Sequence, residues 1–225
     1  LEDIAIANTN AAFEPSLDYV VAKFPRFPFD KFQSASNILG TQMKATGEVM
    51  GIGSNLEECL LKSIRSLEIG VMHLQLAKFD TMKRETLLAY ITEFHSDNIF
   101  AIAELLRRNT DIETLFRATA ITPYFLESIK KIVDMEANLC SHKGNTETLL
   151  AAKKMGFCDA YIAKLWNTEE TEIFNLRRKE NIFPVYRMVD TCHTGAYIPY
   201  FYSSYEGKNE SRLSDKKKII VLGAG

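Results

Sequence analysis

The sequence predicts a mainly α protein: an irregular bundle of about seven short helices, with a few short N-terminal β-strands and a C-terminal strand. Two observations support this fold class. Between residues 79 and 181 glycine is nearly absent, and helix-capping signals recur about every 10–20 residues. Before residue 54, β-rich apolar runs are separated by proline and glycine, which favours short strands.

The first predicted elements are strands within residues 17–24 and 43–52. A β-rich apolar run is closed by Pro25, and three glycines punctuate the second run. Between them, residues 25–32 are aromatic and interrupted by prolines, which is too broken a pattern for a helix. No larger sheet is present in the chain to receive these strands. We therefore expect Leu17–Phe24 and Met43–Ile52 to be disordered or paired in a non-native way.

The helices that follow are placed by their caps and by apolar residues at helical spacing. They are expected at residues 54–70, 86–94, 97–108, 112–119, 123–140, 146–155, 159–166 and 168–181. Capping boxes are predicted for Ser54 with Glu57 and for Thr110 with Glu113. Single caps are predicted at Asp97, at Thr168, and at Thr122 before Pro123, which opens the longest helix.

Five aromatic residues of the helical region stand at helical spacing: Tyr124, Phe125, Tyr161, Trp166 and Phe174. Residues of this kind are more often buried than exposed, so we expect each of them in the core. The alternative is that a few of them form an association face, because Tyr and Trp are enriched at protein interfaces.

The C-terminal region is predicted to hold a linker and then a strand. Residues 184–215 are rich in serine and tyrosine, including Tyr197, Tyr200, Tyr202 and Tyr205. A solvated linker rarely carries so many aromatics, so we expect it to lie against a surface. Residues 218–222, KIIVL, are typical of a parallel strand, and Gly223–Gly225 follow.

Length and charge narrow the possible functions. A chain of 225 residues with 46% hydrophobic residues suits one or two domains with a buried core. The net charge of −2 offers no dominant positive field, so we expect no nucleic-acid partner. The basic run Lys216–Lys218 fits a solvated edge. No apolar run approaches the roughly 20 residues that span a bilayer, so we expect no membrane association.

The cysteines and histidines lack the spacing of metal sites. They are Cys59, Cys140, Cys158, Cys192, His73, His95, His142 and His193. Neither CxxC nor HxxxH occurs, so we expect no metal site and reduced, intracellular thiols. The expected location is cytoplasmic, with an organelle matrix as the alternative. No signal peptide or initiator Met is visible, and the chain is expected to be a piece of a longer protein.

Candidates for acid–base or phosphate chemistry are few. Glu14, Asp18 and Glu48 are the best-placed acids, but lone carboxylates in turns more often cap backbone N–H groups than act in catalysis. Gly223–Gly225 resembles the start of a phosphate cradle, yet no helix N-terminus follows to supply a dipole. We therefore expect no catalytic, cofactor-binding or metal-binding residue in this chain.

Several motifs, in order, resemble the large subunit of carbamoyl phosphate synthetase. They are FEPSLDYVV (13–21), PRF (25–27), TQMK with TGEVM (41–50), GIGSNLEECLLKSIRSLE (51–68) and MGFCDAYIAKLWNTEETEIFNLRRKENIFPVYRMVDTC (155–192). The earlier motifs are similar to the tail of its first ATP-grasp domain. The last is similar to the helical region between its two halves, generally called the oligomerisation domain. The resemblance covers essentially the whole chain.

This resemblance implies four regions. They are the tail of the carboxyphosphate (ATP-grasp) domain at 1–70, the helical oligomerisation domain at 71–183, a linker at 184–215, and the start of the carbamoyl phosphate domain at 216–225. The strands at the N-terminus would then be left from an ATP-grasp domain. In the family, the residues that bind ATP and metal lie upstream of FEPSLDYVV, so the fragment is expected to be inactive and to hold no cofactor.

The resemblance also implies the parent reaction: an ATP-dependent ligase, with Mg²⁺ and K⁺, that makes carbamoyl phosphate from bicarbonate and glutamine-derived ammonia. The product serves pyrimidine and arginine biosynthesis, and a glutaminase small subunit is the implied partner. This fragment is expected to connect the two halves and to self-associate through its helical domain. Two alternatives are a stand-alone helical protein-interaction module related to the synthetase, and a nucleotide-binding enzyme in its own right.

Overall fold

The computed structural model describes residues 3–4, 9–10, 14, 16–32, 34–190 and 197–221. The helices in this part are α1 (Leu56–Ser66), α2 (Ala77–Asp80), α3 (Arg84–Ile91), α4 (Asn98–Arg107), α5 (Ile112–Thr119), α6 (Pro123–Ser141), α7 (Thr146–Lys154), α8 (Asp159–Trp166) and α9 (Glu170–Lys179). The strands are β1 (Asp3–Ile4), β2 (Thr9–Asn10), β3 (Val20–Arg26), β4 (Gly47–Gly53), β5 (Val185–Met188) and β6 (Phe201–Ser204), with a 3₁₀ turn η1 (Pro28–Asp30).

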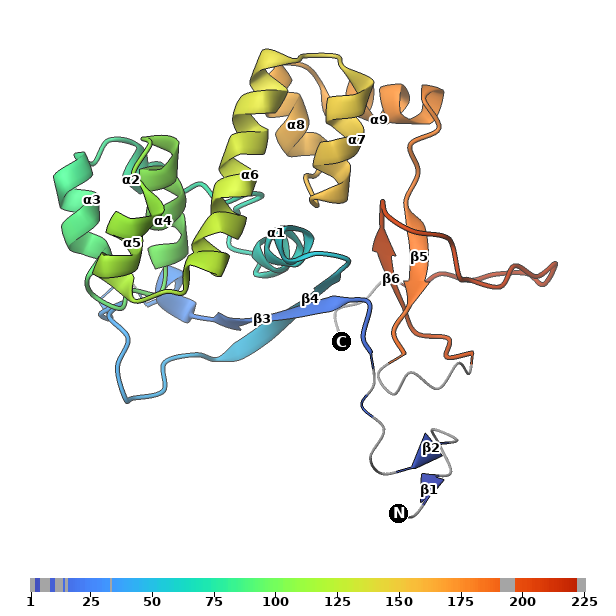
Figure 1. The fold of residues 1–225 in the computed structure, drawn as a ribbon, viewed down its shortest axis with the longest axis horizontal. Helices are drawn as coiled ribbons and strands as arrows, with labels where there is room; N and C mark the ends of the chain where they lie inside the picture. The colour runs from blue at the N-terminus through green and yellow to red at the C-terminus, as the bar shows by residue number, and fades with distance from the viewer. Residues whose placement is uncertain are drawn as a thin grey trace.

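The described part of the chain is mainly helical with a few short antiparallel strands, which confirms the mainly α fold class. Figure 1 shows the long helix α6 standing between two groups of helices, with α2–α5 on one side and α7–α9 on the other. Helix α1 lies between α6 and the β3–β4 hairpin. No helix in the described ranges has both the length and the apolar character needed to cross a membrane.

The N-terminal strands form a hairpin that packs on α1. Strand β3 pairs antiparallel with β4, from Val20 opposite Gly53 to Arg26 opposite Gly47. A Cβ atom added at Gly51 would lie 2.5 Å from the carbonyl oxygen of Cys59, so only glycine lets β4 lie this close to the helix. Of the two alternatives expected for Leu17–Phe24 and Met43–Ile52, disorder is therefore wrong for the paired residues, because β3 and β4 pair with each other and are covered by α1. The other alternative, a non-native pairing, stays a prediction.

The helix predictions are confirmed for all the longer helices, and α5 and α8 have the predicted bounds. Helix α2 was not predicted, because a single turn of four residues has no apolar period to detect. Twenty-eight buried residues form one core that runs through α1 and both helix groups, and Leu61, Ile64 and Phe79 are among its fully buried side chains.

Several predicted caps are displaced by one residue. Helix α1 is capped by Asn55, whose side chain accepts a bond from the Glu58 backbone N–H, and not by Ser54. The Glu58 carboxylate in turn accepts from the Ser54 backbone N–H at 2.8 Å. Helix α5 is likewise capped by Asp111 in place of Thr110. An Asp or Asn side chain next to a Ser or Thr can accept hydrogen bonds from the same N–H groups, and in α1 and α5 the Asn or Asp is the one that accepts them.

At the remaining caps, a residue can hold the predicted cap position without making the cap hydrogen bond. Thr122 is the N-cap of α6 and Asp97 that of α4, as predicted, but neither side chain makes a cap hydrogen bond. Helix α9 follows Glu169, so the predicted cap at Thr168 is wrong by one residue. The Thr168 hydroxyl is bonded to the Glu172 carboxylate instead.

The C-terminal region differs most from its prediction. Residues 218–221 form no strand, and Ile219 is 90% exposed, because an isolated apolar run has no sheet edge to pair with. Leu222 and Gly223–Gly225 lie outside the described residues. Strands β5 and β6 form a hairpin within the predicted linker. Tyr202 is buried there, which confirms that part of this segment lies against the rest of the protein.

Candidate association surface and buried ionic clusters

A buried cluster of charges joins α4, α6 and the segment before α2. The Glu136 carboxylate accepts two bonds from Arg107, both at 2.7 Å, and one from His73 Nε2 at 2.7 Å. The Arg107 guanidinium also donates to the carbonyl oxygen of Leu74. The His73 ring stacks on Tyr161 of α8 at a centroid distance of 3.9 Å. The Glu136 carboxylate therefore links α6 to α4 and to the segment before α2, which are far apart in sequence.

The protonation of this cluster follows from its surroundings. Burial opposes ionisation of Glu136, but the bonds from Arg107 and His73 outweigh it, and the pKa of the carboxyl is lowered. Burial lowers the pKa of His73 and outweighs its bond to Glu136. The neutral ring therefore donates from Nε2, and its Nδ1 has no hydrogen-bond partner among the residues described.

A second buried cluster joins α7, α8 and α9. The Asp159 carboxylate accepts from Lys153 at 2.7 Å and from Arg177 at 2.5–3.0 Å. Burial acts to raise the pKa of Asp159, but Arg177 and Lys153 together lower it. The Tyr205 ring, beyond β6, lies 4.9 Å from the Lys153 ammonium and 5.6 Å from the Arg177 guanidinium. This cluster therefore also fixes the C-terminal hairpin region.

The predicted core aromatics divide into two sets. Tyr161 and Trp166 are 6% and 8% exposed, as predicted, and the Trp166 indole N–H donates to the carbonyl oxygen of Leu139. Tyr124, Phe125 and Phe174 are 59%, 49% and 45% exposed, so their assignment to the core is wrong. The first two lie in the first turn of α6, away from the side that carries the fully buried Leu126 of the core. Phe174 lies under the Arg177 and Arg178 guanidinium groups.

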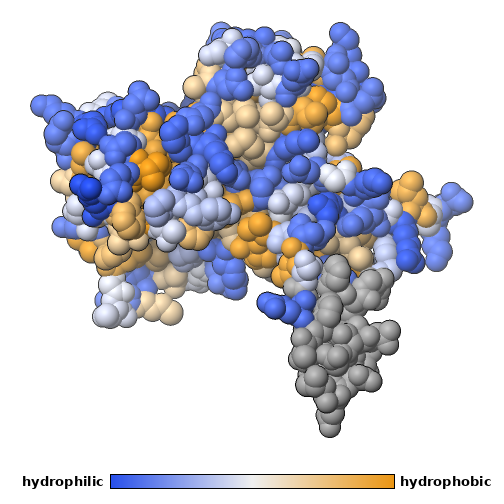
Figure 2. All heavy atoms as spheres, in the orientation of Figure 1, coloured by the Kyte–Doolittle hydropathy of each residue, from blue (hydrophilic) through white to orange (hydrophobic). Residues whose placement is uncertain are grey.

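Three exposed aromatic residues stand at the turn from α5 to α6, and we call them the aromatic corner: Phe116, Tyr124 and Phe125. The rings of Tyr124 and Phe125 meet edge to face at 5.4 Å. Figure 2 shows that apolar surface on the visible face of the molecule is divided into separate patches among polar residues. Exposed aromatic residues of this kind are enriched at association faces, which makes the aromatic corner a candidate for one.

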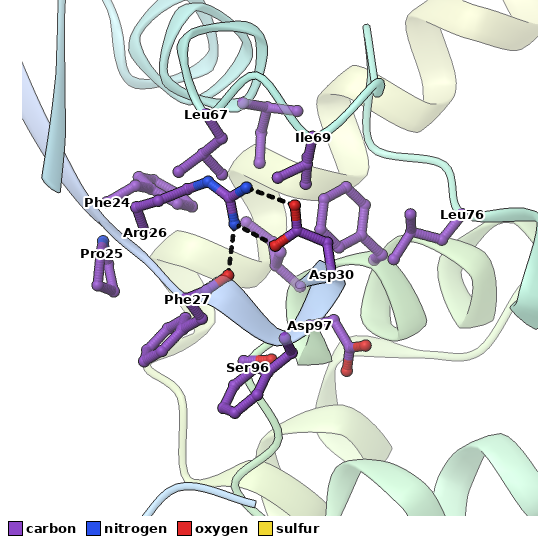
Figure 3. Close-up of a pocket in the computed structure, with 14 residues that line it drawn as sticks. Phe24, Pro25, Arg26, Phe27, Asp30, Leu67, Ile69, Leu76, Ser96 and Asp97 are labelled. Atoms are coloured by element: carbon purple, nitrogen blue, oxygen red, sulfur yellow. Dashed lines mark hydrogen bonds and ion pairs between the residues drawn. The ribbon is translucent and has the colours of Figure 1, made fainter. Parts of the chain in front are cut away.

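A pocket of 270 Å³ lies between the β3–η1 segment and helices α1 and α4 (Figure 3). Its walls are mainly apolar and include Phe24, Leu67 and Ile69. At its mouth the Arg26 guanidinium bonds both oxygens of the Asp30 carboxylate, at 3.0 and 2.8 Å. Because these charges neutralise each other, and Asp97, which also lines the pocket, pairs with Lys78, the pocket offers mainly apolar surface.

The residues that the sequence offered for catalysis are not brought together. Asp18 pairs with Arg187, and Glu48 pairs with Lys23, so these acids form ion pairs and do not cap backbone N–H groups. Glu14 is exposed. Cys192, His193 and Gly223–Gly225 lie outside the described residues.

The remaining histidines and cysteines are dispersed in the same way. His95 stacks on Tyr90, and exposed His142 is bonded to the carbonyl oxygen of Asn138. Burial raises the pKa of the Cys59 thiol to about 11. Within the described ranges, His, Cys, Asp and Glu side chains nowhere gather in a group of three or more suited to a metal.

The residues of the two ionic clusters were not singled out from the sequence. A usable signal was nevertheless present, because Glu136 falls on the apolar stripe of α6 between Val133 and Leu139. A charge on a buried stripe needs a partner, which predicts an internal ion pair. The identity of that partner comes from other helices, and helix periodicity does not reveal it.

A comparison with known families identifies a match for more than half of the chain. The model of the family described as carbamoyl-phosphate synthetase large chain, oligomerisation domain, matches residues 48–181. The matched range runs from within β4 to two residues past the end of α9. It includes both ionic clusters and the aromatic corner.

Proposed function

The chain belongs to the carbamoyl-phosphate synthetase large-chain oligomerisation domain family, and from this premise we propose that it serves as a connecting and self-association module of that large chain. The module holds the segments on either side of it in a fixed relation. The role of the module is mechanical, and none of its residues takes part in the reaction.

The observation that carries this proposal is the anchoring of two distant segments to one helix. The β3–β4 hairpin packs against α1 through Gly51 and Gly53. From the other end of the chain, Ser204 is bonded to Ser54 at 3.1 Å and to Glu58 at 3.1 Å. Helix α1 also contacts α6. Such an arrangement suits a rigid connector better than a flexible linker.

The parent protein, on the same proposal, is the glutamine-hydrolysing synthetase. It is an ATP-dependent ligase that uses Mg²⁺ and K⁺, works with a glutaminase small subunit, and supplies carbamoyl phosphate for pyrimidine and arginine biosynthesis in the cytoplasm. The ATP-grasp centres would lie in other parts of that protein. This chain alone is then inactive, and a nucleotide-binding assay on it should show no saturable binding.

Self-association is tested by the solution mass of the chain, measured by light scattering over a wide range of concentrations. We expect a reversible increase in mass with concentration. A double variant, Tyr124→Ser with Phe125→Ser, should weaken association, because it removes apolar surface from the aromatic corner. The matched control is Val21→Ser with Met50→Ser, which changes two residues of similar exposure, one on each strand of the β3–β4 hairpin.

Deletion of residues 1–53 is less suitable, because it would uncover Cys59 and Ile64 on α1, both fully buried. A monomer at every concentration would contradict self-association and leave only the connecting role. Association that is lost equally in both double variants would mean that the aromatic corner is not its specific site.

A further inference from the structure

A groove of 530 Å³ lies where α1, β4 and the β5–β6 hairpin meet. Its polar lining is provided by Lys62, Arg65 and Ser66 of α1, and by Tyr200 and Tyr202 of the C-terminal hairpin region. It shares no lining residue with the apolar pocket of Figure 3. The groove is thus formed by two segments that are neighbours in sequence, β4 and α1, and by residues 200–203, which are distant from both.

Arg65 is the unusual residue of this groove. Its side chain is half-buried, and Nη1 donates to the carbonyl oxygen of Gly156 at 2.9 Å. No carboxylate of the described residues lies within ion-pair distance of it, whereas Arg107 and Arg177 each have one. Burial also lowers the pKa of the Arg65 guanidinium. A partly desolvated cation without a counter-ion is unfavourable, and an anion would relieve that cost.

The neighbouring charges do not supply that anion. The Lys62 ammonium pairs with Glu58 at 2.9 Å and also bonds the carbonyl oxygens of Ile52 and Ser203. The other oxygen of Glu58 accepts from Ser54 and Ser204. The Lys62 and Glu58 charges therefore cancel each other, and Arg65 leaves the groove with a net positive charge.

The other polar groups of the groove are hydroxyls that can donate. Tyr202 is 7% exposed, and its hydroxyl lies near the Ser54 side chain but makes no hydrogen bond of good geometry among the residues described. Ser66 and Tyr200 are exposed at the rim. A buried hydroxyl without a partner is uncommon, because leaving it unpaired costs about 1–3 kcal/mol. The lining therefore combines one cation with several donors.

We propose that this groove binds a small oxyanion, with the Arg65 guanidinium as the charged anchor and the Tyr202 hydroxyl as a second donor. The planar guanidinium matches both carboxylate and phosphate, since it offers parallel N–H donors to two oxygens. A carboxylate and a phosphate can both accept these two N–H bonds, but they differ in shape and in charge. The site is independent of self-association, because the aromatic corner lies on α5 and α6.

The test is a titration of the whole chain with inorganic phosphate and, in a parallel arm, with acetate, both against chloride at matched ionic strength. Isothermal calorimetry gives the affinity, and backbone NMR signals of residues 62–66 and 200–203 locate the site. We expect saturable binding of at least one of the anions. Arg65→Gln should reduce that affinity by about tenfold or more, as expected for loss of a charge-assisted hydrogen bond.

The matched control is Arg178→Gln, because Arg178 is exposed and, among the residues that the structure describes, also has no carboxylate within ion-pair distance. This variant makes the same change in net charge and should leave the affinity unchanged. Because Arg65 also bonds Gly156, Tyr202→Phe provides a second test that removes only the Tyr202 hydroxyl. It should weaken binding severalfold without lowering stability. No saturable response to either anion, or equal losses in Arg65→Gln and Arg178→Gln, would overturn the proposal.

Discussion

At the scale of single residues, Glu136 is the carboxylate on which the helical region depends. It is 7% exposed and bonded to both Arg107 and His73. Glu136→Gln keeps the shape of the side chain but leaves the Arg107 guanidinium without its main counter-charge. We expect a loss of about 3 kcal/mol in the free energy of unfolding, because breaking a buried pair strands the remaining charge. Urea denaturation measures this loss.

Asp134→Asn is the control on the same helix. Asp134 pairs with Lys130, but both side chains are about half exposed or more, at 60% and 48%. An exposed pair contributes little, so the change should stay within about 0.5 kcal/mol. Equal effects of the two substitutions would mean that the Glu136 cluster is not a stabilising element of the fold.

The sequence predicts such residues only in part. The apolar stripe of α6 predicts that Glu136 is buried, but its partners come from α4 and from the segment before α2. The proposed anion site was harder still to foresee. Arg65 lies one turn from Lys62 on an ordinary amphipathic helix, and the missing counter-ion is visible only when β4 and the C-terminal hairpin are in place.

At the scale of elements, the helices and the two strands of the N-terminal β3–β4 hairpin were predictable, whereas the C-terminal strands were not. Helix periods and caps are local, so α5 and α8 have their predicted bounds. A strand depends on a partner, and KIIVL has the composition of a strand without one. Caps were displaced by one residue where an Asn or Asp adjoins a Ser or Thr, since both side chains can accept from the same N–H groups.

Two glycines that follow helices allow the cost of backbone strain to be distinguished from the cost of a steric clash when each is replaced by alanine. Gly144 and Gly156 both have positive φ, at 77° and 87°. A Cβ at Gly144 would meet nothing within 4 Å, but at Gly156 it would lie 2.9 Å from the Glu58 Cα. Gly144→Ala should therefore cost about 1 kcal/mol from the left-handed backbone alone. Gly156→Ala should cost about 2 kcal/mol more, because the turn after α7 and helix α1 must separate.

Thermal or urea unfolding of the two glycine variants decides between these contributions. The difference between them isolates the contact of the α7–α8 turn with α1, since the backbone term is common to both. If Gly144→Ala and Gly156→Ala lose the same stability, the close approach at Glu58 is relieved by a small shift and does not define the position of α1.

At the scale of the whole molecule, the two ionic clusters and α1 join the two helix groups to the β3–β4 and β5–β6 hairpins. Helix α6 meets α1, α4, α5, α7 and α8, and α1 also carries the N-terminal hairpin. The sequence predicted the helices of this unit, together with a family resemblance. It did not predict that the N-terminal strands and the C-terminal segment close on the same helix, because that contact is set by tertiary packing at Gly51, Gly53 and Ser204.

The dependence of global stability on pH follows from these clusters. The folded-state pKa values of His73, Glu136 and Asp159 are all lowered, from ordinary values of 6.5, 4.5 and 3.8. Below each ordinary value the unfolded chain binds more protons than the folded chain, so the free energy of unfolding must fall as the pH falls. We expect a first decline below about pH 6.5 from His73, and a steeper one below about pH 4.5 from the carboxylates.

Urea denaturation at a series of pH values measures this profile. His73→Gln preserves a hydrogen-bond donor toward Glu136 but does not titrate, so it should flatten the decline between about pH 6.5 and 5 and leave the carboxylate step in place. His142→Gln is the control, because His142 is exposed. A wild-type profile that is flat from pH 7 to about 5, or the same first decline in His73→Gln, would mean that His73 keeps its ordinary proton affinity in the fold.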